Sequence, residues 1–146
     1  MLSRHTRSSI PGLLHQRRFY QPIKAKKQIG GIMDHILVID DEDMVLNFLR
    51  SALAYFGYSV TVAHDGKEAI ELINNGYNFD LVITDINMPR MNGNAVAKHI
   101  RSSDKSETPI VAITGYGDDI DRELFNFVLL KPFDLEALAD VVRSFT

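Results

Sequence analysis

The sequence contains no cysteine, no apolar run of transmembrane length and no acidic residue before Asp34. Without cysteine the chain cannot form disulfides, bind metals through thiolates or use a cysteine nucleophile. A membrane-spanning helix needs about twenty mainly apolar residues, and no segment approaches that length. We therefore expect a cytoplasmic protein. The 146 residues, 45% of them hydrophobic, suffice for one globular domain with a full core.

Charge divides the chain at residue 33. Residues 1–33 carry seven Lys and Arg and no acid, whereas the other nine Lys and Arg face all nineteen Asp and Glu, which leaves residues 34–146 at −10. An acidic body repels the phosphates of nucleic acids. We expect residues 34–146 to form a domain that binds neither nucleic acid nor a membrane.

Residues 1–33 show no sustained apolar period, and we expect a disordered or weakly ordered basic extension. Three interpretations remain open. The acid-free, Arg- and Ser-containing composition is typical of a targeting segment, and a basic arm for nucleic acid or membrane is the second interpretation. We favour the third, an over-extended translation start, because Gly30 and Gly31 can be encoded by a ribosome-binding sequence just before Met33.

Short apolar runs alternate with amphipathic segments from residue 35 onward. We expect strands over 35–40, 58–63, 79–85, 109–115 and 127–131, and helical segments over 42–57, 66–76, 93–103, 118–125 and 134–145. This alternation predicts an α/β fold, with a five-stranded parallel sheet sandwiched by helices. Ligands of such folds bind at the carboxyl ends of the strands.

Polar residues stand at the carboxyl ends of four of these predicted strands: Asp40 with Asp41, Asp85, Thr114 and Lys131. Each has a simpler explanation when taken alone. An acid favours the N-terminus of the next helix, an aspartate caps a loop, threonine is common in strands, and a single lysine is usually solvated. Because parallel strands end along one edge, these residues together predict a shared site.

The charges of this predicted site favour a metal ion and a phosphoryl group. Two carboxylates about 4 Å apart repel by roughly 4 kcal/mol at an effective dielectric constant of about 20. Oxygen ligands favour Mg²⁺, which leaves coordination positions for phosphate oxygens. An aspartate can serve as nucleophile and carry a phosphoryl group, which the Lys131 ammonium and the Thr114 hydroxyl suit as neighbours.

Four motifs occur in order along residues 35–146: "ILVIDDE", "DLVITDINMPRMNG", "IVAITGYGD" and "LLKPF". In these motifs the chain resembles response-regulator receiver domains of the stand-alone, chemotaxis-regulator type. The resemblance implies a flavodoxin-like receiver fold and a phosphoryl group received from a sensor histidine kinase or a histidine phosphotransfer protein. It implies self-phosphorylation and slow self-dephosphorylation rather than enzymatic turnover.

The same resemblance assigns roles to individual residues. It implies that Asp85 is the phosphoacceptor. It implies a Mg²⁺ site made of Asp41, Asp85 and the Asn87 main-chain carbonyl, with Asp40 acting through water. Thr114 and Lys131 are expected to contact the phosphoryl oxygens.

Two features depart from the pattern of the family. Val128 stands where the family often has Tyr or Phe as the aromatic part of its switch. Thr114 and Lys131 are closer in sequence than usual, by about one helical turn, so we expect the fourth helix to be shortened. We therefore predict a monomer, with a rearrangement of residues 115–119 on phosphorylation and no stable dimer.

Three alternative functions fit the sequence less well. A flavodoxin-like FMN protein needs a hydroxyl- and glycine-rich loop after the first strand, where this chain has acids. A phosphatase of the haloacid-dehalogenase type expects a second aspartate where Asn87 stands. A receiver that is never phosphorylated, acting as a binding module, disagrees with the complete set of acids and lysine. Since the last predicted helix ends at Phe145, we expect no output domain and an unspecified target, reached by protein contact or phosphotransfer.

Overall fold

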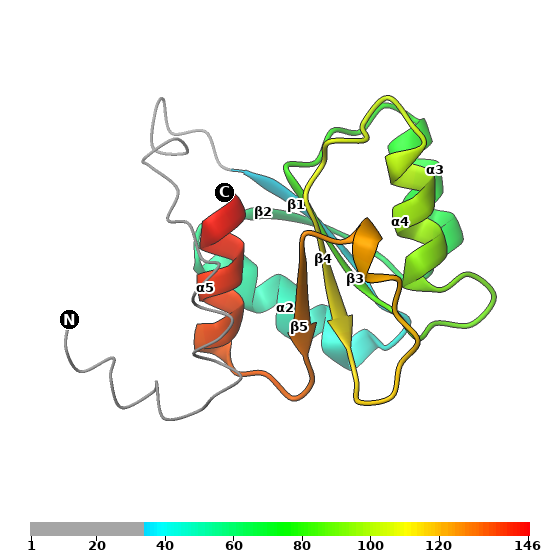
Figure 1. The fold of residues 1–146 in the computed structure, drawn as a ribbon. Coiled ribbons are helices and arrows are strands. Elements are labelled where there is room, and N and C mark those ends of the chain that lie inside the picture. The colour runs from blue at the N-terminus through cyan, green and yellow to red at the C-terminus, as the bar shows by residue number, and fades with distance from the viewer. Residues whose placement is uncertain (1–33) are drawn as a thin grey trace.

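The computed structural model describes residues 34–146 (Figure 1). The predicted basic extension, residues 1–33, lies outside the described residues. In chain order the elements are β1 (His35–Ile39), α2 (Asp43–Tyr55), β2 (Ser59–Ala63), α3 (Gly66–Asn74), β3 (Leu81–Asp85), α4 (Gly93–Arg101), β4 (Ile110–Thr114), η3 (Arg122–Leu124), β5 (Phe127–Leu130) and α5 (Leu135–Phe145). The strands and the four α-helices lie where the periodicity predicts, within about two residues at each end.

The five strands form one parallel sheet in the order β2-β1-β3-β4-β5, which confirms the predicted architecture. β3 lies in the middle and pairs with β1 on one side and with β4 on the other. All strands run in the same direction, so their carboxyl ends meet along one border of the sheet, here called the carboxyl edge. Asp85 pairs there with Ile113, and Thr114 pairs with Leu130.

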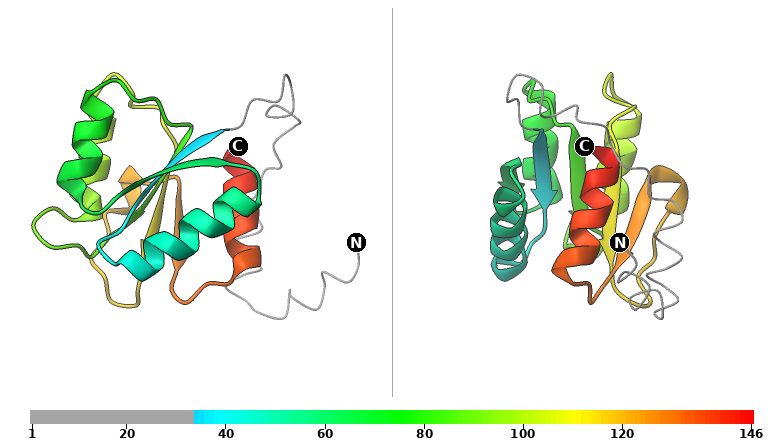
Figure 2. Two further views of the ribbon diagram at one scale, coloured as in Figure 1. Left: turned by 180° about the vertical axis from the view of Figure 1, so that it is seen from behind. Right: turned by 90° about the vertical axis from the view of Figure 1, so that its left-hand side faces the viewer.

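Helices cover both faces of this sheet (Figure 2). On one face α2 and α5 bury Leu53 and Leu138, and on the other α3 and α4 bury Ile73 and Ile100. Every residue of β3 and β4 is buried. A strand covered on both faces needs apolar side chains on both, which explains the continuous apolar runs in the sequence.

Three helices start at a capping side chain close to the carboxyl edge. The side chains of Asp65, Asn92 and Asp134 accept hydrogen bonds from main-chain N–H groups in the first turns of α3, α4 and α5. Each such cap stabilises a helix start by about 1 kcal/mol. The loop that follows Asp85 at the end of β3 and the loop that carries Lys131 after β5 are therefore each held between a rigid strand end and a capped helix start. The helix α2, which follows Asp40 and Asp41, starts at Glu42 without a side-chain cap.

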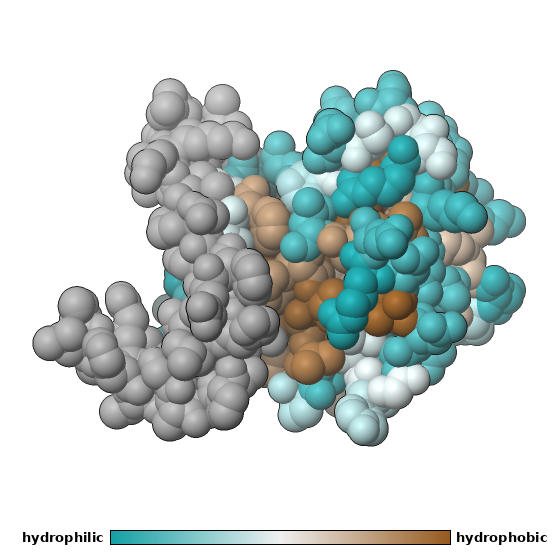
Figure 3. Space-filling view, viewed as in Figure 1, coloured by the Kyte–Doolittle hydropathy of each residue, from teal (hydrophilic) through white to brown (hydrophobic). Residues whose placement is uncertain are grey.

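The fourth helical segment is a single 3₁₀ turn, Arg122–Leu124, which confirms the predicted shortening. It leaves part of β5 uncovered. Figure 3 shows this side of the molecule, where hydrophobic residues are exposed along β5 beside hydrophilic ones over η3 and α4. Leu130 of β5 is 50% exposed. Within residues 34–146, no helix is long and apolar enough to cross a membrane.

Candidate functional site

Three carboxylates meet at the carboxyl edge of the sheet. One oxygen from each of Asp40, Asp41 and Asp85 lies within 4.8 Å of the others, and we call this group the acid triad. Asp40 and Asp85 are buried, with 0% and 4% exposure, whereas Asp41 is exposed. The structure therefore brings together the three acids that the sequence predicts at one site.

The backbone explains why these acids meet. Asp40 directly follows β1, Asp85 is the last residue of β3, and the two strands are neighbours. Gly93, at the start of α4, lies against the end of β3 and donates its N–H to the Ile86 carbonyl at 2.9 Å. A Cβ at this glycine would clash with the Asp85 carbonyl oxygen and stand 3.0 Å from the Ile86 Cα. Only glycine permits this close approach.

Lys131 provides the positive charge next to the triad. Its Nζ lies 3.4 Å from Asp85 Oδ1, which also accepts the Ile86 N–H at 2.9 Å. Asp40 Oδ1 accepts the Glu42 N–H at 2.9 Å. The second oxygen, Asp40 Oδ2, is buried and has no hydrogen-bond partner among the described residues. Since a buried polar atom without a partner is costly, this oxygen suits an additional cationic ligand.

The pKa shifts at the site indicate that its carboxylates have too little positive charge around them. Burial raises the pKa of Asp40 from 3.8 to about 6, the Glu42 amide opposes this, and the nearby charge of Asp85 adds to it. Burial also raises the pKa of Asp85, although Lys131 works against the rise. Burial lowers the pKa of Lys131, but the carboxylates of Asp85 and Asp40 outweigh it and raise that pKa overall. Oxygen ligands with excess negative charge fit a hard divalent cation.

The remaining predicted residues lie at the same edge or near it. Thr114 ends β4 and is 2% exposed. Asn87 is exposed in the loop after β3, and Val128 is half-buried in β5 and pairs with Ala112. The aliphatic side chain of Val128 thus stands where the family often has an aromatic ring.

Asp118 is a residue that the sequence reasoning missed. Its Oδ2 accepts hydrogen bonds from the Thr114 hydroxyl at 2.9 Å and from the Gly115 N–H at 2.7 Å. The signal was available in "TGYGD", because an aspartate three or four residues after a strand end often bonds back to the main chain of its own loop. What the pattern could not show is that the same oxygen also binds the threonine.

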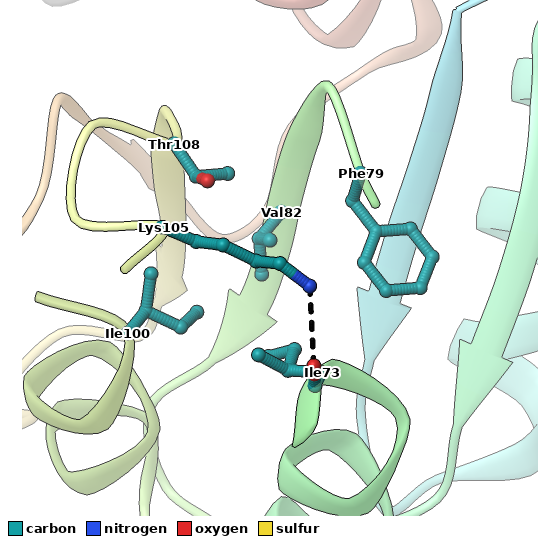
Figure 4. A pocket seen from close by; sticks show the side chains of 6 residues that line it. All are labelled: Ile73, Phe79, Val82, Ile100, Lys105 and Thr108. Carbon is teal, nitrogen blue, oxygen red and sulfur yellow. Dashed lines mark hydrogen bonds between the residues drawn. The ribbon is translucent and has the colours of Figure 1, made fainter. Parts of the chain in front are cut away.

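A small cavity at the opposite edge of the sheet has a structural explanation rather than a functional one (Figure 4). Its lining residues are Ile73, Phe79, Val82, Ile100, Lys105 and Thr108. The Lys105 ammonium lies across it and donates to the main-chain carbonyls of Ile73 at 3.2 Å and Tyr77 at 2.7 Å. Ile73 is in the last turn of α3 and Tyr77 follows the helix, so the lysine caps the C-terminal end of α3.

Comparison with known proteins identifies the family. The sequence model of one protein family, described as the response regulator receiver domain, matches residues 36–143 of this chain. The chain belongs to this family. As a receiver domain of a two-component system, it is a phosphoacceptor signalling module and not a catalytic enzyme, and its acid triad is typical of the metal-binding phosphorylation site of such domains. The flavodoxin and phosphatase alternatives are thereby excluded.

Several receiver-containing proteins are similar. The transcriptional regulatory protein CpxR of Escherichia coli (strain K12) is 32% identical over 117 residues, which cover 77% of this chain and 49% of CpxR. A probable transcriptional regulator, ycf27 of Cyanidium caldarium, is 35% identical over 75% of this chain and 45% of its own length. The chemotaxis protein CheY4 of Vibrio cholerae superposes with a TM-score of 0.70 at 27% identity, covering 78% of this chain and 99% of CheY4. The chain spans about half the length of the curated relatives it matches.

Proposed function

We propose that Asp85 is the phosphoacceptor of this receiver domain and takes a phosphoryl group from a phosphohistidine. The observation that carries the proposal is the 3.4 Å contact between Asp85 and Lys131. Among the acid triad, Asp85 is the carboxylate placed against the cation that a transferred phosphoryl group needs. Asp40 lies deeper, and Asp41 is exposed. A receiver that is never phosphorylated has no need of this complete set.

We propose that the acid triad and the main-chain carbonyl of Asn87 form a metal site, and that the metal ion is Mg²⁺. The unpartnered, buried Asp40 Oδ2 and the crowding of the three carboxylates support this. When bound, Mg²⁺ neutralises the carboxylates and coordinates phosphoryl oxygens. Asp41 and Asp85 are the direct ligands in this assignment, and Asp40 acts through water.

The chain's own residues account for the transfer. An Asp85 carboxylate oxygen forms a bond to phosphorus as the P–N bond of the phosphohistidine breaks, and the electron pair of that bond stays on the imidazole. Lys131, which its carboxylate neighbours keep protonated, stabilises the negative charge on the phosphoryl oxygens. The Thr114 hydroxyl donates to one of these oxygens. Positioning and charge stabilisation supply most of the catalysis in such transfers.

The partner is a sensor histidine kinase or a histidine phosphotransfer protein. Exposed apolar side chains lie on the helices that begin at the carboxyl edge: Met44 and Phe48 on α2 are 84% and 45% exposed, and Leu135 on α5 is 43% exposed. The Phe48 ring stands 6.4 Å from that of Phe133, which precedes α5, so the two helix starts form one apolar surface. Clustered exposed apolar residues mark interaction sites, and we name these four residues the docking patch.

The wider role follows from the domain itself. We propose that residues 34–146 act as a monomeric receiver in the cytoplasm, without contacting nucleic acid or membrane. The acidic charge of these residues supports the first of these exclusions. The signal passes on by protein contact or by onward phosphotransfer in a phosphorelay.

Asp85→Asn tests the assignment. The amide has the shape of the carboxylate but is not a nucleophile, so labelling by acetyl phosphate with Mg²⁺ should disappear while the circular dichroism spectrum stays unchanged. Asp104→Asn is the matched control, since Asp104 is exposed in the loop after α4, and it should be labelled like the wild type. Acid-labile phosphate on Asp85→Asn would show that another residue is the acceptor.

A further inference from the structure

The Asp118 side chain accepts hydrogen bonds from two donors at the end of β4, a hydroxyl and a main-chain N–H. Its Oδ2 accepts from the Thr114 hydroxyl and the Gly115 N–H, at 2.9 Å and 2.7 Å, and its own N–H donates to the Gly115 carbonyl at 3.2 Å. Thr114 is almost fully buried, so its hydroxyl depends on a protein acceptor. A carboxylate oxygen thus lies between two donors at the edge of the sheet that carries Asp85.

We infer that Asp118 is a positioning residue that holds the Thr114 hydroxyl in the unphosphorylated protein and releases it on phosphorylation. This inference rests on the function proposed above. A hydroxyl has a single proton to donate, so Thr114 cannot serve Asp118 and a phosphoryl oxygen at the same time. Both acceptors are anionic oxygens, and the switch is an exchange of one for the other.

The structure also limits how far this release can spread. Asn94 of α4 donates to the Asp119 carbonyl at 2.8 Å and accepts the Asp121 N–H at 2.9 Å. Further on, Arg101 of α4 donates to the Leu124 carbonyl at 3.1 Å and to Asn126 Oδ1 at 2.7 Å. From residue 119 onward, the connection to β5 is therefore bound to a core helix.

The segment left to move is residues 115–118. Tyr116 is fully exposed, and Gly117 has a φ of 92°, which other residues rarely adopt. The hydrogen bonds of Asp118 hold this segment closed. We call residues 115–118 the latch loop, and its opening moves the exposed Tyr116 and frees the Asp118 carboxylate without displacing β5.

A latch of this kind opposes phosphorylation. The apparent affinity for a phosphoryl group falls in proportion to the fraction of molecules in which Thr114 is released. Because hydrogen bonds to charged acceptors are stronger than neutral ones, the latched form dominates in the unphosphorylated protein. Removal of Asp118 should therefore tighten binding of a phosphoryl mimic, by about ten-fold.

The test uses beryllofluoride with Mg²⁺ as the probe, titrated into the full chain and followed by the amide resonance of Gly115. Asp118→Ala should reach half-saturation at about ten-fold lower concentration than the wild type. Asp118→Asn keeps an acceptor oxygen without the charge, so its half-saturation concentration should lie between those of Asp118→Ala and the wild type. Asp119→Ala removes a neighbouring exposed charge but no latch bond, and should match the wild type.

Thr114→Val separates a latch from a merely structural role, because it removes the hydroxyl for which the two acceptors compete. In the Thr114→Val background, Asp118→Ala should raise the affinity for beryllofluoride much less, since only the Gly115 amide remains to be released. The same gain in both backgrounds, or equal behaviour of the Asp118 and Asp119 variants, would overturn the inference. If Asp118→Ala fails to fold, Asp118→Asn decides. Failure of the wild type to bind the probe would overturn the proposed function itself.

Discussion

Asp40 and Asp41 are neighbours in the chain but lie in different environments. Successive residues of an extended chain point to opposite sides, so Asp40 is buried behind the site while Asp41 faces solvent. The sequence predicts both acids at the carboxyl edge, since each follows an apolar strand. It does not predict which one bears the cost of burial, because that depends on how the strand end meets the following helix.

The raised pKa of Asp40 has a consequence for stability. Its value of about 6 in the folded protein exceeds the ordinary 3.8, so the stabilising contribution is complete below pH 3.8 and is lost as the pH rises through about 6. Without Mg²⁺, Asp40→Asn should therefore be more stable than the wild type at pH 7.5, by up to about 3 kcal/mol, with little difference near pH 4.

Urea unfolding at the two pH values, with EDTA present, measures this difference. Asp41→Asn is the control, because its carboxylate is exposed and its removal should matter less. With Mg²⁺ at pH 7.5 the wild type should regain most of the deficit, since a ligand that binds the folded state stabilises it. Equal stability of Asp40→Asn and the wild type in EDTA at pH 7.5 would mean that Asp40 is not the costly carboxylate.

At the scale of elements, the shortened connection between β4 and β5 was predictable from the sequence, because Thr114 and Lys131 are too close for a full helix. What replaces that helix was not. The 3₁₀ turn is tied to α4 by Asn94 and Arg101 through main-chain carbonyl and N–H groups. Such bonds leave no periodic pattern in the sequence, and neither do those of Asp118.

The docking patch makes a prediction about α2. Phe48→Ala should slow phosphotransfer from a histidine kinase that phosphorylates the wild type by about ten-fold, as expected for one well-packed aromatic contact at an interface. Labelling by acetyl phosphate should be unchanged, because Phe48 lies outside the acid triad. Tyr55→Ala is the matched control: Tyr55 is 84% exposed at the far end of the same helix and should affect neither reaction. Equal loss with both phosphate donors would place Phe48 in the site itself.

At the scale of the whole molecule, the order of the strands decides what the site can be. Alternating strand and helix patterns predict a parallel sheet, and the topology then places β1, β3 and β4 side by side with their carboxyl ends together. Residues separated by more than forty positions, such as Asp40 and Asp85, meet for this reason.

The most direct measurement is to locate the phosphoryl group on the wild-type chain. After incubation with acetyl phosphate and Mg²⁺, borohydride reduction of the acyl phosphate and peptide mass spectrometry should identify one modified residue, Asp85. The signal should vanish when EDTA replaces Mg²⁺, because the acid triad then lacks the cation that neutralises it. Modification of a different residue, or equal modification of Asp85 with and without the metal, would contradict the account.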